Sequence, residues 1–223
     1  MRKIFLAVAV LSFVFTACKS EKKVEAKEAK EVTEIASDSR NYKANIAQTV
    51  IEWEGAHLGG IAPHNGTVKI KEGTIKMDGN QIVGGKFTVD FTTIENEDLA
   101  EKPEVQAKLM KHIKHADILN VEKFPEATFE ITSVEVNEGV FNSMITGNLM
   151  FLGSTKSITF PANVTYSESQ ITLDSDQFVI DRTQWGLMYG SASEEEITKM
   201  DEKAKSKVIS NDIKLKIKAV ANQ

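Results

Sequence analysis

Hydrophobic and polar residues alternate along most of the chain from Asn41 to the C-terminus. A repeat of two places every second side chain on the same face of a β-strand, so the pattern predicts strands with one buried face. In the first strand, for example, Ile51 and Trp53 share one face and Glu52 and Glu54 the other. Ten segments follow this pattern, at residues 51–53, 68–70, 75–77, 87–91, 129–131, 145–151, 158–166, 171–173, 178–180 and 213–219.

Short polar turns separate most of these segments. Gly73 is expected to turn the chain between residues 68–70 and 75–77, and Asp78-Gly79-Asn80 to turn it again. No long helical pattern lies between strands, which excludes repeated βαβ units and predicts an antiparallel sheet. A sandwich and a barrel would both bury one face of each strand. The up-and-down order favours an all-β fold closed into an antiparallel β-barrel.

Two segments depart from the alternation and predict one or two short helices. Residues 97–115 are charged, with apolar residues four apart, and indicate a helix that begins after Pro103. Residues 193–208 indicate another, because Ser193 followed by Glu196 fits a capping box. Both helices are polar enough to lie outside the barrel or across its mouth.

The segment Leu149–Leu152 is apolar on both faces of its expected strand. A strand that is apolar on both sides has to be covered on both sides. We therefore expect a helix or a second copy of the chain to cover the outer face of this strand.

Arg182 lies in phase with Phe178 and Ile180, so its side chain is expected to point into the barrel. A buried guanidinium needs a counter-charge or another polar partner. One interpretation is an internal ion pair with Asp174 or Asp176. The other is that Arg182 holds the polar end of a bound ligand at the barrel mouth.

The N-terminus has the pattern of an export signal. Two basic residues precede an apolar run from Ile4 to Phe15, and Thr16-Ala17-Cys18 resembles the end of a bacterial lipobox. We predict a signal peptide at residues 1–17 and lipidation of Cys18, although an ordinary secretory signal with an unmodified cysteine is the alternative. Residues 18–40 contain no Gly, Pro or aromatic residue and balance acidic with basic side chains. They predict a flexible charged tether, with a partner-binding helix as the alternative, followed by the folded domain at residues 41–223.

Composition narrows the classes of function. The 223 residues are 41% hydrophobic with a net charge of −5, which suits a folded domain and provides no general attraction to nucleic acid. The single Cys excludes an internal disulfide framework and a Cys-based zinc site. His112 and His115 could share a metal with His57 or His64, but the adjacent lysines disfavour a cation. No nucleophile elbow, phosphate loop or dinucleotide fingerprint is present, so we expect no catalytic residues, no metal and no cofactor.

Several motifs in one order resemble the YceI-like family. The segment at residues 112–129 is similar to the family pattern HLKSADFFDVEKYPTATF, and Ile118 and Leu119 replace its two Phe. Further similarities lie at residues 64–67, 145–149, 155–162, 178–186 and 189–191. The resemblance runs from about Tyr42 to Ala221 and covers nearly the whole expected domain.

This resemblance implies a lipocalin-like barrel around an apolar cavity that holds an isoprenoid chain or a related long lipid, such as a quinone tail or a fatty amide. It also implies no catalytic residues, a periplasmic location and, in some members, a homodimer. With the predicted anchor, the chain is expected in the cell envelope, tethered to a membrane by acyl groups and facing the periplasm or the cell surface.

We therefore predict that the protein carries or stores a long apolar lipid. The expected apolar lining is Trp53, Phe87, Phe91, Phe129, Leu149, Phe151, Phe160 and Phe178, with Arg182 and Trp185 near the polar end. A barrel filled by its own side chains, acting as a ligand-free interaction module of the envelope, is the alternative.

Overall fold

The computed structural model describes residues 22–32 and 39–223. The predicted signal peptide at residues 1–17 and the lipidation site Cys18 lie outside the described residues. The strands are β1 (Lys22–Lys23), β2 (Lys27–Glu28), β3 (Arg40–Ala44), β4 (Val50–His57), β5 (Ile61–Asp78), β6 (Gln81–Asn96), β7 (Glu126–Val136), β8 (Ser143–Phe151), β9 (Ser154–Tyr166), β10 (Gln170–Ser175), β11 (Phe178–Asp181) and β12 (Ile209–Asn222). The α-helices are α1 (Pro103–Ile113), α2 (Glu194–Lys199) and α3 (Glu202–Lys205), and two 3₁₀ turns are η1 (Leu58–Gly60) and η2 (Arg182–Trp185).

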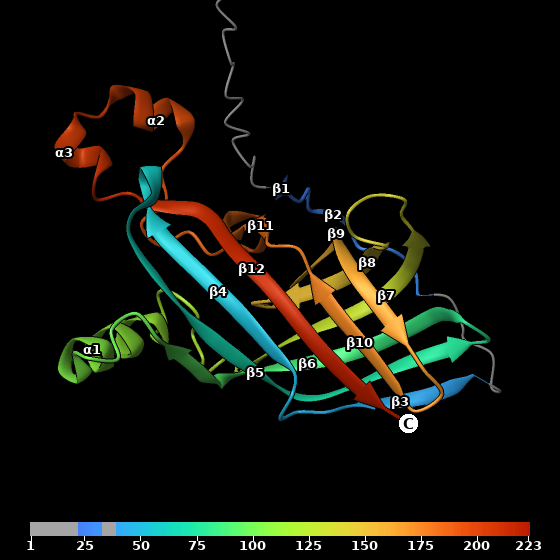
Figure 1. Ribbon diagram of the computed structural model, residues 1–223. Coiled ribbons are helices and arrows are strands. Elements are labelled where there is room, and N and C mark those ends of the chain that lie inside the picture. Colours follow the sequence, from blue (N-terminus) through green and yellow to red (C-terminus); the bar gives the residue numbers. More distant parts are fainter. Residues whose placement is uncertain (1–21, 33–38) are drawn as a thin grey trace, which may run out of the picture.

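The long strands form a closed antiparallel barrel (Figure 1). Strands β4 to β9 each pair with the next in sequence, and β12 pairs with both β10 and β4 to complete the ring. Closure leaves the ring strands with partners on both sides over much of their length, which satisfies their backbone groups. The predicted all-β antiparallel barrel is confirmed.

Strand β5 corrects the expected turn at Gly73. The strand is continuous through this residue, and a register shift between Ile70 and Glu72 moves the inward-facing side chains from even to odd positions. A Cβ on Gly73 would lie 2.4 Å from Cδ1 of Phe87, so the glycine permits close approach of an aromatic ring. The predicted turn at residues 78–80 is present, with Gly79 at a φ of 55°.

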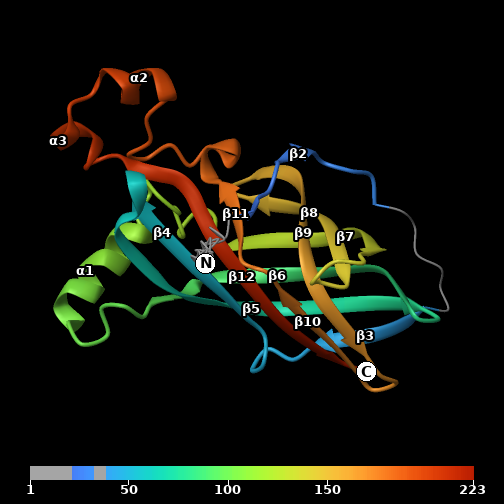
Figure 2. The ribbon, with the colours of Figure 1, turned by 45° about the horizontal axis from the view of Figure 1, so that its top comes forward.

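The helices gather at one end of the barrel (Figure 2). Helix α1 begins at Pro103, as the sequence predicts. The capping box of Ser193 and Glu196 is also present, but the second helix is shorter than expected. Extended backbone at Met200 ends α2, and Asp201 then caps α3 by accepting a hydrogen bond from the backbone N–H of Ala204.

The end of the barrel opposite α1 is filled with side chains. Tyr42 closes this end, where its hydroxyl donates to the carbonyl oxygens of Ser167 and Glu168 at 3.4 and 3.2 Å. The filled half therefore supplies most of the packed core. Its central residues are each at most 2% exposed: Tyr42, Ile75, Met77, Ile131, Ile145 and Ile171.

The apolar segment Leu149–Leu152 marks the end of a strand. Leu152 and Gly153 have φ of 50° and 79° and form the two-residue turn between β8 and β9. Met150 is then the single outward-facing apolar residue of the segment, and it is exposed. The outer face of β8 thus does not need the cover that we expected, because Leu152 belongs to the turn.

Residues 22–32, which we call the strap, lie against the barrel. Strand β1 pairs in parallel with β11, and β2 pairs antiparallel with β9. Beyond β2, the backbone N–H and carbonyl of Lys30 bond the side-chain amide of Asn148 at 2.9 and 2.7 Å. Val24 and Ala26 pack against the core. For residues 22–32, the prediction of a flexible, solvated tether is wrong. These residues pair with the barrel because β9 and β11 have free strand edges that offer backbone partners.

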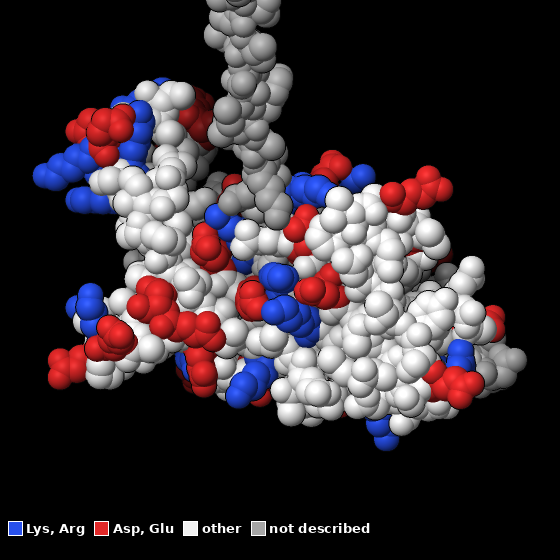
Figure 3. Space-filling view, viewed as in Figure 1, with Lys and Arg blue, Asp and Glu red and all other residues white. Residues whose placement is uncertain are grey.

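The outer face of β4 and β12 carries alternating charges (Figure 3). Lys214 pairs with Glu54 at 2.9 Å and Lys218 with Glu52 at 3.4 Å across the two strands. Solvent-accessible pairs on a surface of this kind contribute little to stability. They do interleave the two signs of charge, so this face carries no large patch of one sign.

Candidate binding cavity

The half of the barrel nearest α1 encloses a cavity of about 390 Å³. Its walls come from β4 to β9, β11 and β12, and Leu109 and Ile113 of α1 contribute from the mouth. This volume lies within the range of about 300–1,000 Å³ that is usual for ligand sites. Because the lining is almost entirely hydrocarbon, the cavity suits an apolar chain.

Three aromatic rings form the inner end of the cavity. Phe160 stacks on Phe178, with ring centroids 4.6 Å apart and planes 6° apart. Phe129 also packs against Phe160, with ring centroids 5.7 Å apart and planes tilted by 44°. On β8, Ile145 is the register partner of Phe160 and belongs to the filled half. The rings therefore separate the packed core from the open cavity.

Most of the predicted lining residues face this cavity, namely Trp53, Phe91, Phe129, Leu149, Phe151, Phe160 and Phe178. Phe87 does not line it. It is the register partner of Gly73, and its ring occupies the space that the glycine leaves in the packed half. This difference arises because inward direction alone does not tell how deep in the barrel a side chain lies.

Trp185 also lies outside the lining. It is 3% exposed, and its indole N–H donates to the carbonyl oxygen of Leu149 at 3.0 Å. Its ring packs on Phe151, with centroids 6.4 Å apart. Trp185 therefore supports the lining from behind and ties η2 to β8.

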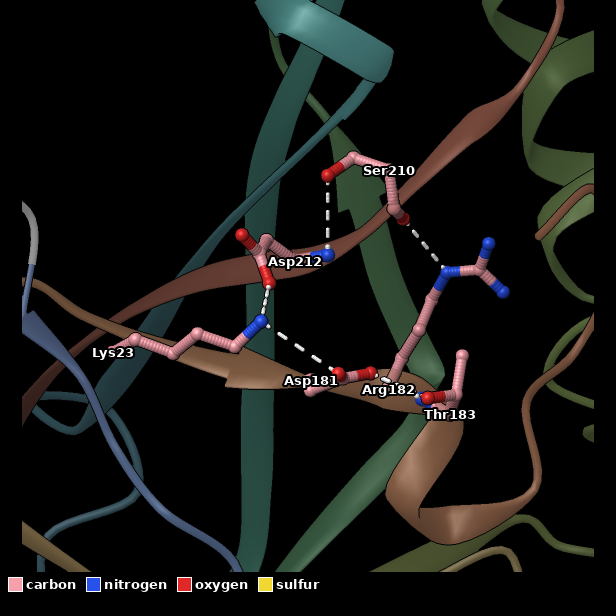
Figure 4. Close-up of polar contacts among 6 residues, drawn as sticks. All are labelled: Lys23, Asp181, Arg182, Thr183, Ser210 and Asp212. Atoms are coloured by element: carbon pink, nitrogen blue, oxygen red, sulfur yellow. Dashed lines mark hydrogen bonds and ion pairs between the residues drawn. The ribbon is translucent and has the colours of Figure 1, made fainter. Parts of the chain in front are cut away.

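Arg182 faces the cavity and is buried, with 3% of its surface exposed. Its Nε donates to the carbonyl oxygen of Ser210 at 2.9 Å (Figure 4). Its two terminal nitrogens donate to the carbonyls of Leu187 and Ile209. These bonds hold the loop after η2 against the start of β12. Three of the five guanidinium N–H groups are used in this way, which leaves donors for a polar group in the cavity.

The expected ion pair of Arg182 with Asp174 or Asp176 does not form. Asp174 lies 3.9 Å from Nζ of Lys216, and Asp176 accepts a hydrogen bond from the backbone of Gln177. Burial lowers the pKa of Arg182, and the nearby charge of Asp181 opposes that effect. Carbonyl oxygens thus replace the carboxylate that the sequence suggested.

Histidines line the mouth of the cavity. The sequence suggested only that these histidines were metal ligands or surface residues. Nδ1 of His57 lies 2.7 Å from the carbonyl oxygen of Ser206, and Nδ1 of His64 lies 2.9 Å from Oδ2 of Asp98. A carbonyl oxygen can only accept, so His57 donates from Nδ1 and its Nε2 is left for another partner.

His112 adds a third imidazole at the mouth, where its ring meets that of Tyr189 edge-on at 5.2 Å. His115, in contrast, pairs with Asp117 at 3.0 Å and does not line the cavity. Within residues 22–32 and 39–223, no group of three or more His, Cys, Asp or Glu side chains is placed to hold a metal ion.

Asp98 anchors the connection from β6 to α1. It accepts hydrogen bonds from the backbone N–H of Asn65, from His64 and from the side-chain amide of Asn96. Burial alone would raise the pKa of Asp98, but these hydrogen bonds outweigh it and lower the pKa. The ionised carboxylate therefore positions His64 and the polypeptide that leads into α1.

Comparison with known proteins supports this arrangement. The YceI-like domain matches residues 42–221, which is most of the barrel. This chain belongs to the YceI-like family. A curated relative, a UPF0312 protein of Pseudomonas putida strain F1, is 36% identical over 112 residues, which is 50% of this chain and 54% of the relative. Another, from Azotobacter vinelandii, is 34% identical over 128 residues and covers 54% and 63% of the two chains. The chain spans about half the length of the first of these relatives.

Solved structures share the fold of this YceI-like domain. BcnA of Burkholderia cenocepacia superposes with a TM-score of 0.59 at 17% identity, covering 80% of this chain and 99% of BcnA. A domain of Saccharophagus degradans described as polyisoprenoid-binding has a TM-score of 0.54 at 11% identity, covering 81% and 97%. In the part of the YceI-like chain that the structure describes, no helix is long and apolar enough to cross a membrane.

Proposed function

We propose that this protein binds one long apolar lipid chain, of the isoprenoid, quinone or fatty-amide class, inside its barrel. The observation that carries the proposal is the cavity of about 390 Å³ above the Phe129, Phe160 and Phe178 rings. Membership of the YceI-like family supports it, as does the fold shared with a domain described as polyisoprenoid-binding. The hollow interior disfavours the alternative of a filled, ligand-free barrel.

Burial of the lipid tail would provide the driving force. Removing apolar surface from water contributes about 25 cal/mol per Å², and the ordering of a flexible tail offsets part of this gain. In the proposed pose, the tail lies on the aromatic rings and the polar head lies near Arg182 and His57. The remaining guanidinium donors would bind a head-group oxygen, which favours lipids with a carbonyl, hydroxyl or acidic head.

The wider role that we propose is transport or storage of this lipid in the cell envelope. It depends on export by residues 1–17 and on an acyl anchor at Cys18, which the lipobox-like sequence supports. Binding, with no catalytic step and no cofactor, is the proposed activity.

Native mass spectrometry of the purified full-length chain, followed by solvent extraction, tests the proposal. We expect a co-purifying mass in the range of a long isoprenoid, quinone or fatty amide. Phe151→Asp should abolish retention, because Phe151 lines the cavity. Met150→Asp is the matched control, because Met150 is the neighbour of Phe151 in the chain, faces outward and is exposed. A chain that stays ligand-free after incubation with all three lipid classes would refute the proposed function.

A further inference from the structure

The barrel wall is incomplete beside the cavity if only the long strands are considered. Strand β10 pairs with β9 only over residues 162–166 of β9. Toward the mouth, β11 takes the place beside β12, and no pairing joins β11 directly to β9 among the described residues. Ile158 on β9 and Ile180 on β11 both line the cavity, so this gap lies next to the binding space.

The strap fills this gap. Lys22 and Lys23 pair with Phe178 and Val179 of β11, and further along, β2 pairs with residues 156–157 of β9 (Figure 1). The backbone N–H of Val24 also donates to the carbonyl of Val179 at 2.8 Å. Val24 and Ala26 pack inward while the residue between them is exposed. The strap thus behaves as a strand of the wall, with alternating inward and outward side chains.

Lys23 ties the strap to the rim of the cavity (Figure 4). Its Nζ lies 2.6 Å from Oδ1 of Asp212 and 3.6 Å from Oδ2 of Asp181. The hydrogen bond to Asp212 is the main cause of a raised pKa of Lys23. Asp212 is one of the residues that line the cavity, so Lys23 ties the strap to a strand of the cavity wall.

The strap makes fewer contacts with the barrel than the other wall strands do, although Lys30 adds two hydrogen bonds to Asn148. Each of its strands has two residues, and Val24 and Ala26 are its partly buried apolar side chains. Its other ion pair to the barrel, Glu28 with Lys156 at 3.0 Å, involves an exposed carboxylate and contributes little. Segments with few buried contacts open locally while the rest of a fold stays intact.

We propose that the strap is a removable section of the cavity wall and that lipid enters and leaves sideways, through the gap between β9 and β11, when the strap lifts. This inference rests on the proposed function, because it assigns the entry route to the same cavity. Passage through the mouth beside α1 is the competing route.

A disulfide between the strap and β9 provides a direct test. Glu28 and Lys156 are antiparallel register partners, whose Cα atoms lie about 4.5–5.5 Å apart in such pairs, within the range a disulfide accepts. The variant Glu28→Cys/Lys156→Cys is made in the full-length chain with Cys18→Ser, so only the introduced pair can oxidise. Glu28→Ser/Lys156→Ser in the same background is the matched control, because it removes the ion pair without locking the strap.

The probe is decylubiquinone, whose quinone ring quenches tryptophan fluorescence, and Trp53 in the lining is the reporter. Loaded protein is mixed with excess phosphatidylcholine vesicles in a stopped-flow instrument, and recovery of fluorescence gives the release rate. We expect the oxidised variant to release the quinone about tenfold or more slowly than the serine control. Equal rates would overturn the inference in favour of the mouth. Absence of quenching in both proteins would exclude quinones from the proposed ligand class and overturn the inference drawn with this probe. The proposed function as a whole falls only if mass spectrometry finds none of the three lipid classes bound.

Discussion

Replacing Phe160 with Ala should enlarge the cavity downward, toward the packed half of the barrel. Phe160 is 1% exposed, stacks on Phe178 and packs against the tilted ring of Phe129 at the inner end of the cavity. Removing a fully buried Phe costs about 3–5 kcal/mol, and the loss of two aromatic contacts places this site toward the upper end of that range. A domain in the middle or upper part of the ordinary stability range of about 5–15 kcal/mol would remain folded.

The same substitution should change which lipid binds best. The space vacated by the ring is continuous with the cavity, so a longer tail can reach further into the barrel. Each additional buried methylene contributes about 0.8 kcal/mol. The variant should therefore prefer the longer of two quinones that differ only in tail length, compared with the unsubstituted protein.

Urea unfolding followed by circular dichroism measures the stability change, and tryptophan quenching measures affinity for the two quinones. Phe87→Ala is the matched control, because Phe87 is buried in the barrel but does not line the cavity. It should destabilise the protein and leave the tail preference unchanged. A stability loss below about 1 kcal/mol for Phe160→Ala, far under the range for a buried Phe, or an unchanged tail preference, would refute this account of the cavity floor.

Three further changes test how the site is supported. Trp185→Phe should lower the free energy of unfolding by about 1–3 kcal/mol, because the carbonyl of Leu149 loses its donor; an unchanged urea midpoint would contradict this. Gly147→Ala should cost about 1–3 kcal/mol through overpacking, visible as a lower melting temperature, since the new methyl would lie 2.4 Å from Cζ of Phe129; an unaltered melting curve would argue against it. The lowered pKa of Asp98 means that its contribution to stability is present above its unfolded pKa of about 3.9 and is lost as the pH falls through the lower folded value. Asp98→Asn should therefore flatten the acid side of a plot of unfolding free energy against pH, and identical plots for the two proteins would show that Asp98 is not the group responsible.

Local sequence patterns determined the strands and most of the inward-facing residues. Alternation with a period of two is a property of the strand itself, so Trp53, Phe91 and Phe151 could be assigned to the interior without knowledge of their neighbours. The capping box at Ser193 and the helix start at Pro103 are equally local, and the structure contains both. At Gly73 the local signal misled, because a glycine that admits an aromatic ring has the same sequence appearance as one that makes a turn.

Only the tertiary structure decided where the barrel is hollow and which distant groups meet there. Whether Phe87 packs in the filled half or lines the cavity depends on the total volume of the side chains that all the strands contribute at that depth. The sequence of one strand does not contain this information. Arg182 finds carbonyl oxygens at residues 187, 209 and 210 because a loop and the start of β12 fold back over it. The strap shows the same dependence: the sequence of residues 22–32 is that of a solvated segment, and it joins the wall because the fold leaves two strand edges open beside it.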